Sequence, residues 1–464
     1  MRRLLVVLVV VTLVVGAAVS YRRLNPSMIT EQWDVIVVGS EPEGVMAGIA
    51  AARSGAKTLL VTPDPILGRT MTLAKLNSLD MSFNSKNELL TRGLFEEWWQ
   101  KVDRAFSFVI EDAIEAFDTM VKAEPNLTVR KQTQLVRVEQ QKSTRDMTGL
   151  ILNDSGQVYR ARGLVFIDAT ADANLAAATG VRYIIGRDDI GQPGVTMAPT
   201  LVFEVSGVNW DEIVRYVRGL RDPRYGVTQD SAWAYWEIAA RYQPADPKTY
   251  LRGLNIGRQG PDRVLINALL IFDIDVLDDA SKQQGIMRGT AEAKRIVEFL
   301  QKEAPGFAHA SFVGVAPQLY IRESRYIDGL YRLTLEDVFE EKHHWDEIAV
   351  GAYPVDIQAV SPQEREKTLY APVNGYGIPF RCLVPAQGPD NLLVIGRSAS
   401  YGSQPAGSAR VIPVGMVEGQ AAGVAAVQAI QKKVGFRELA ADRQAIGELQ
   451  QKLLKQGAYL RPTK

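Results

Sequence analysis

The chain has 464 residues, 46% of them hydrophobic, which is long enough for two or three domains and typical of a globular protein. Lys and Arg total 53, as do Asp and Glu, so the formal net charge is zero. This balance argues against nucleic acid as the main partner, because nucleic-acid binding needs a positive face. Cys382 is the single cysteine, which excludes an internal disulfide.

The N-terminus carries an apolar run over residues 4–19 with arginines on both sides. This pattern predicts a hydrophobic signal or membrane helix over residues 1–24. Ala18-Val19-Ser20 would serve as a cleavage site, whereas Arg22-Arg23 fits an uncleaved anchor better. The flanking charges nearly balance and barely decide orientation. We expect a protein that contacts the membrane through this segment or is exported, with the extracytoplasmic side favoured.

The first predicted unit is a strand over 34–38, a helix over 42–54 and a strand over 57–62. The turn between the first two reads Gly39-Ser40-Glu41-Pro42-Glu43-Gly44. Apart from Glu41 at the middle glycine, this is the G-x-G-x-x-G pattern, with which a doubly wound domain holds the pyrophosphate of a dinucleotide. The pattern predicts dinucleotide binding here.

Further along, periodicity predicts helices over 88–109 and 110–122 and strands over 129–137, 149–152 and 163–169. The next region has longer strands, over 200–205 and 264–276, and an amphipathic helix over 281–303. A strand over 391–396 and helices over 413–431 and 436–456 complete the chain. We therefore predict an α/β fold, with a Rossmann-like domain formed by residues 25–182 and 371–432, an inserted α+β substrate domain over 183–370 and a C-terminal helix over 433–464.

Two later segments also fit a flavin dinucleotide. In Asp168-Ala169-Thr170 and the small residues after it, a strand ends where a cofactor can approach the backbone. In Gly396-Arg397 and the helix containing Gly415 and Gly419, a glycine turn precedes a helix whose N-terminus is a suitable anion site.

With Arg322-Glu-Ser-Arg325, Gly351-Ala-Tyr-Pro354 and the stretch 376–385, these segments resemble the FAD-dependent oxidoreductase family of the glutathione-reductase-type fold. The resemblance covers most of residues 34–431 and implies FAD as cofactor. It implies cofactor contacts at Gly39, Ser40, Glu41, Gly44, Thr62, Gly68, Arg69, Val136, Ala169, Thr170, Asp172, Gly396, Arg397, Gly415 and Gly419.

Three of these positions depart from the expected pattern. Glu41 places a carboxylate near the pyrophosphate, with Glu43 in the same helical turn. Either the two repel the phosphates, or they complement the helix N-terminus and point to solvent, and we favour the second alternative. Thr62 stands where an acid usually binds the ribose, although Asp64 is close enough to substitute. Arg69 replaces a glycine and either reaches a phosphate or narrows the approach.

Flavin itself supplies the redox chemistry, so the protein needs groups that orient substrate and stabilise charge. The catalytic candidates are Arg322, Arg325, Arg381 and Arg410 as anion or flavin-electron stabilisers, and Tyr353 and Tyr376 as proton donors. For any single arginine, a structural salt bridge is the competing interpretation. Three histidines and one cysteine leave little material for a metal site or a catalytic triad, so we predict neither.

The leading hypothesis is an FAD-dependent oxidoreductase that transfers hydride or electrons between a small organic substrate and non-covalently bound FAD. The alternative is a degenerate family member that acts as a non-catalytic binding or scaffold protein, motivated by Glu41, Thr62 and Arg69. An enzyme that uses only NAD(P) is disfavoured, because it has no use for the segment 396–423. The sequence assigns neither the substrate nor the electron acceptor.

Overall fold

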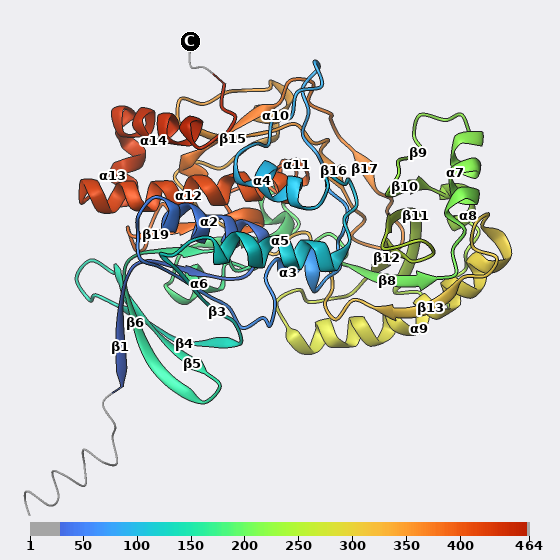
Figure 1. Ribbon diagram of the computed structural model, residues 1–464, viewed down its shortest axis with the longest axis horizontal. Coiled ribbons are helices and arrows are strands. Elements are labelled where there is room, and N and C mark those ends of the chain that lie inside the picture. The colour runs from blue at the N-terminus through green and yellow to red at the C-terminus, as the bar shows by residue number, and fades with distance from the viewer. Residues whose placement is uncertain (1–27, 462–464) are drawn as a thin grey trace, which may run out of the picture.

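The computed structural model describes residues 28–461, which fold into two lobes placed side by side (Figure 1). The predicted signal or anchor over residues 1–24 lies outside the described residues. Within residues 28–461, no helix combines the length and apolar character needed to span a bilayer.

The first lobe is built on a seven-stranded sheet with the order β3-β2-β1-β6-β5-β4, and β19 pairs with β6. Strands β3, β2, β1, β6 and β19 are parallel, and β5 and β4 continue the sheet antiparallel. Their bounds are β1 Ile29–Val38, β2 Thr58–Val61, β3 Leu127–Arg130, β4 Thr133–Gln140, β5 Met147–Asp154, β6 Gln157–Asp168 and β19 Leu392–Val394. The α/β Rossmann-like fold predicted for this region is thus present, with the apolar runs of β1 and β2 fully buried, as parallel strands require.

Two helices lie in contact against this sheet: α2, Pro42–Arg53, and α12, Ile412–Lys432. Small residues let them approach closely. A Cβ on Gly419 would stand 2.0 Å from the Glu43 carbonyl oxygen, and one on Gly423 would stand 2.4 Å from that of Ala47. This contact attaches the C-terminal part of the chain to the first β-α-β unit.

Shorter elements complete the first lobe: α3 Arg69–Thr72, α4 Leu94–Lys101, α5 Ile110–Lys122, α6 Asn174–Ala178, β7 Tyr183–Ile185, β14 Arg325–Ile327, α10 Leu335–Phe339, β15 Glu347–Gly351, β16 Asp356–Ile357, β17 Lys367–Thr368, β18 Tyr376–Pro379, α11 Ala406–Ala409, α13 Phe436–Ala441 and α14 Arg443–Lys455. Three predicted elements are interrupted by local conformation. Gly93 and Asp103, both with positive φ, confine the helix expected over 88–109 to α4. Gln132, at φ 55°, splits the strand expected over 129–137, and Asp442 caps α14 and splits the last helix.

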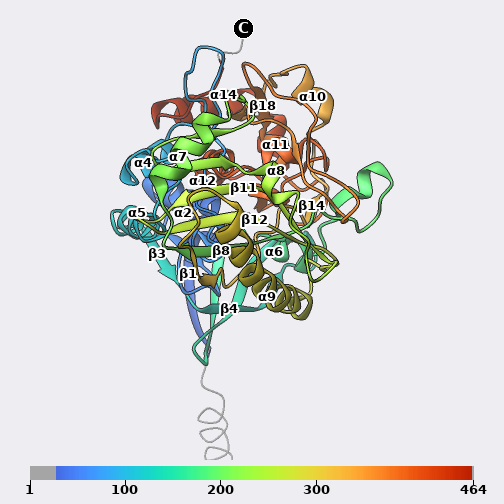
Figure 2. The same cartoon turned by 90° about the vertical axis from the view of Figure 1, so that its right-hand side faces the viewer.

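The second lobe holds an antiparallel sheet with the order β13-β8-β12-β11-β10-β9, packed against three helices (Figure 2). Its elements are β8 Thr200–Ser206, α7 Trp210–Gly219, β9 Gly226–Val227, β10 Ser231–Ala234, α8 Trp236–Ala239, β11 Thr249–Arg258, β12 Val264–Ile271, α9 Asp279–Glu303 and β13 Ser311–Val315. Its core extends from Leu201 to Ile321, a shorter stretch than the predicted 183–370. Residues such as Tyr326 and Ile357 pack in the core of the first lobe instead.

Candidate functional site

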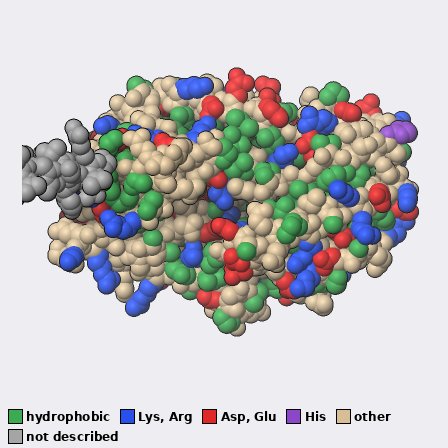
Figure 3. Space-filling view, turned by 90° about the horizontal axis from the view of Figure 1, so that it is seen from below, with side chains coloured by type: hydrophobic (Ala, Val, Ile, Leu, Met, Phe, Trp, Pro, Cys, Tyr) green, Lys and Arg blue, Asp and Glu red, His purple; other side chains and the backbone are tan. Residues whose placement is uncertain are grey.

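Three adjoining cavities lie between the lobes, where the parallel strands β1, β2 and β6 end. The one nearest the end of β2 has a volume of about 410 Å³, the middle one about 260 Å³ and the one nearest α12 about 30 Å³. The carboxyl ends of parallel strands are where open α/β sheets bind ligands. The lower face of the molecule is recessed near its centre, with acidic and basic side chains around the recess (Figure 3).

The first glycine turn packs directly on the end of β6. Gly39 has φ 120°, and a Cβ there would stand 2.2 Å from the Ala169 carbonyl oxygen; one on Gly44 would stand 2.7 Å from the Ala169 side chain. Only glycine fits these two positions. Among the described residues, no acceptor bonds the backbone N–H groups of Ser40 and Glu41 beside the cavity. The turn therefore presents free donors at the N-terminus of α2.

The expectation that Glu41 and Glu43 point to solvent is wrong. Glu41 is only 4% exposed, and its carboxylate accepts a hydrogen bond from Thr70 N at 3.0 Å and lies 3.9 Å from Arg69 Nε. Glu43 turns inward against Gly396. Burial, reinforced by the charge of Glu41, raises the pKa of Glu43 to about 8. The sequence did not predict the inward orientation of these two side chains, because their partners Thr70 and Gly396 are brought to the turn only by the tertiary fold.

At the end of β2, Asp64 rather than Thr62 accepts most of the side-chain hydrogen bonds. Its carboxylate accepts hydrogen bonds from Ser40 Oγ at 2.5 Å, Thr62 Oγ1 at 3.3 Å and Arg69 Nη1 at 3.0 Å. Gly68, at φ 76°, turns the chain towards Arg69, and a Cβ there would clash with Phe117. Arg69 thus lines two of the cavities, and both alternatives, contact with a phosphate or a narrower approach, stay predictions.

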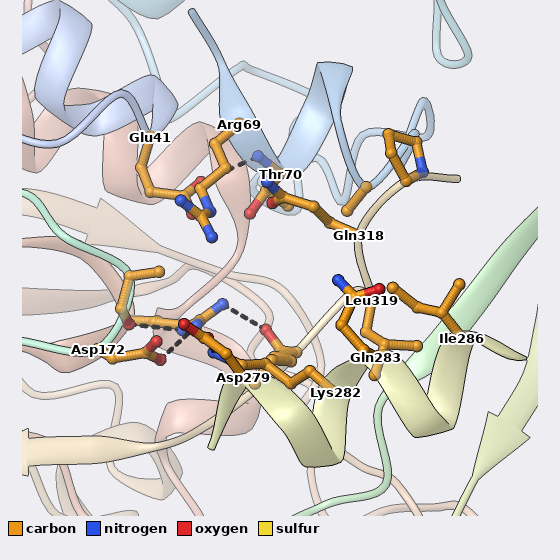
Figure 4. Close-up of a pocket in the computed structure, with 15 residues that line it drawn as sticks. Glu41, Arg69, Thr70, Asp172, Asp279, Lys282, Gln283, Ile286, Gln318 and Leu319 are labelled. Carbon is orange, nitrogen blue, oxygen red and sulfur yellow. Dashed lines mark hydrogen bonds and ion pairs between the residues drawn. The ribbon is translucent and has the colours of Figure 1, made fainter. Parts of the chain in front are cut away.

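The second and third segments meet opposite the first turn. Arg397 donates from Nη2 to Asp172 at 2.7 Å and from Nε to the Ala171 carbonyl at 2.7 Å. Thr170 is held by Asp168, whose pKa burial raises to about 6. In Figure 4, Asp172, Asp279 and Lys282 face Glu41, Arg69 and Thr70 across the middle cavity.

The smallest cavity brings together two of the predicted catalytic arginines. Arg322 and Arg410 line it with Asp80 and Tyr320. Arg410 Nη1 donates to the Tyr320 hydroxyl at 2.8 Å, and the Arg322 guanidinium lies 4.4 Å from the centre of the Tyr320 ring. Burial raises the pKa of Asp80 to about 6, and burial and Asp80 together raise that of Tyr353 well above its usual value.

Three predicted catalytic residues do not line these cavities and have structural partners instead. Arg381 forms a two-pronged ion pair with the fully buried Asp346, at 2.8 and 3.0 Å. Tyr376 donates to Ser408 Oγ at 2.7 Å. Arg325 donates to the Asp172 carbonyl at 2.7 Å and so stabilises the turn after β6. Arg381 and Tyr376 fix the packing around β15 and β18, so their assignment to catalysis is not supported by their position.

Three of the predicted cofactor contacts face elsewhere. Val136 has its side chain 57% exposed on β4, and Gln134 is the β4 residue that lines the cavity, because a register shift follows Leu135. Gly415 and Gly419 face Glu43 in the contact between α12 and α2. Their small size serves helix packing.

Sequence reasoning missed several polar residues that line the site: Asp80, Lys282, Asp279, Gln318 and Tyr320. Asp80 offered little local signal, since Leu79 and Met81 flank it in a stretch where polar and apolar residues alternate. Lys282 offered a weak signal, since helical spacing places it on the α9 face that holds the buried Gly285, Gly289 and Leu300. Only the tertiary fold brings this first turn of α9 to the cavities.

The sequence profile of the family described as FAD dependent oxidoreductase matches residues 34–453. No curated protein sequence matches the chain. Among solved structures, a geranylgeranyl bacteriochlorophyll reductase-like protein from Thermoplasma acidophilum is similar over 92% of this chain and 85% of its own, with 13% identity and a TM-score of 0.46. A flavin-dependent brominase is similar over 91% and 84%, with 11% identity and a TM-score of 0.48. The p-nitrophenol 4-monooxygenase of Pseudomonas putida has the same coverage and identity and a TM-score of 0.43. From its profile match, the chain belongs to the FAD dependent oxidoreductase family.

Proposed function

We propose that this enzyme binds one FAD non-covalently along the two larger cavities and exchanges hydride or electrons between that FAD and a small organic substrate at the smallest cavity. The observation that carries the proposal is the free N–H groups of Ser40 and Glu41 at the head of a continuous series of cavities. Such donors at the end of a parallel strand suit a pyrophosphate.

The residues present fit the cofactor chemically. The cavity of about 410 Å³ is within the usual range for ligand sites. Arg69 and Lys282 line it as cations for the phosphates, and Asp64 has carboxylate lone pairs for the ribose hydroxyls. Arg397, held by Asp172, would face the middle part of the cofactor. Glu41, Asp172 and Asp279 line the same cavity as carboxylates and oppose binding of the phosphates. Each has a cation beside it: Arg69 lies 3.9 Å from Glu41, Arg397 pairs with Asp172 at 2.7 Å and Lys282 pairs with Asp279 at 2.6 Å.

The smallest cavity is the proposed reaction end. When bound, flavin supplies the electron transfer. The protein contributes Arg322 and Arg410 as fixed positive charges. Tyr353, beside Asp80, is the proposed proton donor. Its hydroxyl is protonated at neutral pH, but burial and Asp80 raise its pKa and so make it a weaker acid than a free tyrosine.

The visible spectrum of the purified protein tests this proposal. We expect residues 25–464 to retain a yellow chromophore through desalting and to release it as FAD on denaturation. A matched Gly39→Ala variant should lose the chromophore, since its Cβ would overlap the Ala169 carbonyl. A colourless wild-type protein that takes up no added FAD would refute the proposal and favour the non-catalytic binding protein.

We further propose that residues 1–24 attach the enzyme to a membrane or direct its export, with the extracytoplasmic side favoured. The support is the apolar run over residues 4–19 with its flanking arginines. We expect the full chain to stay with the membrane fraction in high salt, or to be exported with a shortened N-terminus, and residues 25–464 to do neither. Uncleaved full-length protein in the cytoplasmic fraction would contradict this.

A further inference from the structure

The strongest unexplained feature of the site is a group of buried arginines with too few acidic partners. Arg322 is 2% exposed, and within residues 28–461 it donates only to neutral oxygens, those of Ala198 at 3.1 Å and Thr200 at 2.7 Å. Arg410 has its side chain 4% exposed, and its buried Nε has no partner among the described residues. The nearest carboxylate to Arg410, that of Asp356, is 3.6 Å away.

A third arginine adds to this positive charge. Arg252, on β11, is 7% exposed; it donates to the Asn267 carbonyl at 3.2 Å, and its buried Nε has no partner in the described part of the chain. It lies close enough to Arg322 that burial, Arg252 and Arg410 together lower the pKa of Arg322 to about 10. Burying like charges together is costly unless an opposite charge joins them.

The acidic groups nearby do not form an ion pair with Arg322. Asp80, Glu41 and Glu43 line the cavity together with Arg322, Arg397 and Arg410. Burial raises the pKa of Asp80 to about 6 and that of Glu43 to about 8, so these two carboxyl groups hold their charge less readily than free ones. Among the described residues, Asp356 pairs with Arg410 at 3.6 Å, and no carboxylate pairs with Arg322. Arg322 is therefore a buried cation of this cavity that lacks a carboxylate partner within the described part of the chain.

The geometry points to a carboxylate on the substrate: we propose that Arg322 and Arg410, backed by Arg252, bind a carboxylate group of the organic substrate. The proposal rests on the FAD function above and assigns its substrate class. Guanidinium forks match carboxylates in a two-pronged geometry. The cavity of about 30 Å³ has room for about two water-sized atoms, such as the two oxygens of one carboxylate.

The test uses acetate and succinate as probes, with acetamide and succinamide as their neutral counterparts, at constant ionic strength in chloride. We expect the carboxylates, but not the amides, to change the visible spectrum of the bound flavin and to saturate. Arg322→Gln should weaken carboxylate binding by at least about tenfold, since each lost charged hydrogen bond is worth about 1.5–3 kcal/mol. Arg322→Lys should lose less, and Arg263→Met, an exposed arginine of the same lobe, should lose nothing.

Several results would overturn the proposal. These are equal responses to amides and carboxylates, no response to either, or an Arg322→Gln variant that loses FAD but binds carboxylates as tightly as the wild type. In the last case the arginines serve the cofactor. Thermal unfolding of the cofactor-free protein separates the two proposals. A colourless protein that acetate or succinate still stabilises, and that loses this response in Arg322→Gln, would refute FAD binding while supporting the anion subsite.

Discussion

Replacing the carboxylate of Glu41 with an amide tests how the first turn binds FAD. Glu41→Gln removes one negative charge beside the pyrophosphate site but keeps an oxygen that can accept the hydrogen bond from Thr70 N. Two unit charges separated by about 4 Å, as Glu41 and Arg69 are, interact by about 4 kcal/mol at an effective dielectric of 20. A phosphate at a similar separation is repelled by as much.

The positive charge of the partly exposed Arg69 and the surrounding water reduce the repulsion between Glu41 and the phosphate. We therefore take about half of the 4 kcal/mol, about 2 kcal/mol, as the expected gain in binding free energy. A gain of about 2 kcal/mol corresponds to FAD binding about 30-fold tighter. Glu41→Gly should gain less, because it leaves Thr70 N–H without its partner, at a cost of about 1–3 kcal/mol.

Titration of the cofactor-free protein with FAD, followed by quenching of flavin fluorescence, gives the dissociation constants. Glu43→Gln is the matched control. Because its pKa is about 8, Glu43 is mostly protonated at pH 7, and its replacement should change FAD affinity little there. Unchanged or weaker binding of FAD by Glu41→Gln would refute the reasoning and show that the carboxylate does not oppose the phosphates.

The remaining predictions concern stability. Glu418 has its pKa raised by burial to about 8 from 4.5, so the folded state holds its proton more tightly and stability falls as pH rises from about 4.5 to 8; Glu418→Gln should flatten this decline in urea unfolding at pH 5 and pH 8. Arg381→Met leaves the buried Asp346 unpaired and should cost about 3–5 kcal/mol, while the FAD content and turnover of the folded fraction stay unchanged. A drop in turnover without loss of stability would restore Arg381 as a catalytic residue. Gly419→Ala should lower the melting temperature, because its Cβ would stand 2.0 Å from a carbonyl oxygen of α2, at a cost of about 1–3 kcal/mol. Gly447→Ala, in open space on α14, should raise it slightly, and equal effects at the two positions would contradict this packing argument.

Much of the first β-α-β unit could be predicted because its signals are local. An apolar run, the turn at Gly39 and a helix of small residues specify strand, turn and helix over a few neighbouring positions. Local patterns did not predict the break in the strand expected over 129–137, where Gln132 adopts a positive φ. Non-glycine residues rarely adopt this conformation, so the residue type does not indicate it.

The roles of the charged residues could not be predicted in this way. Arg322 and Arg381 look alike in sequence. Arg322 lines a cavity and has no acidic partner among residues 28–461, whereas Arg381 is paired with Asp346. The difference depends on which segment, distant in the chain, supplies a carboxylate. Arg252 and Asp80 lie far from Arg322 in the chain and near it in space for the same reason.

The sequence by itself determined the Rossmann-like architecture, the family and the cofactor, since these follow from short patterns read along the chain. The tertiary structure alone decided that Glu41 is buried on Thr70, that Asp64 accepts most of the side-chain hydrogen bonds at the end of β2, and that Arg322 and Arg410 share one cavity. The physical reason is that charge pairing and desolvation depend on through-space distance, which only the packing of the two lobes sets.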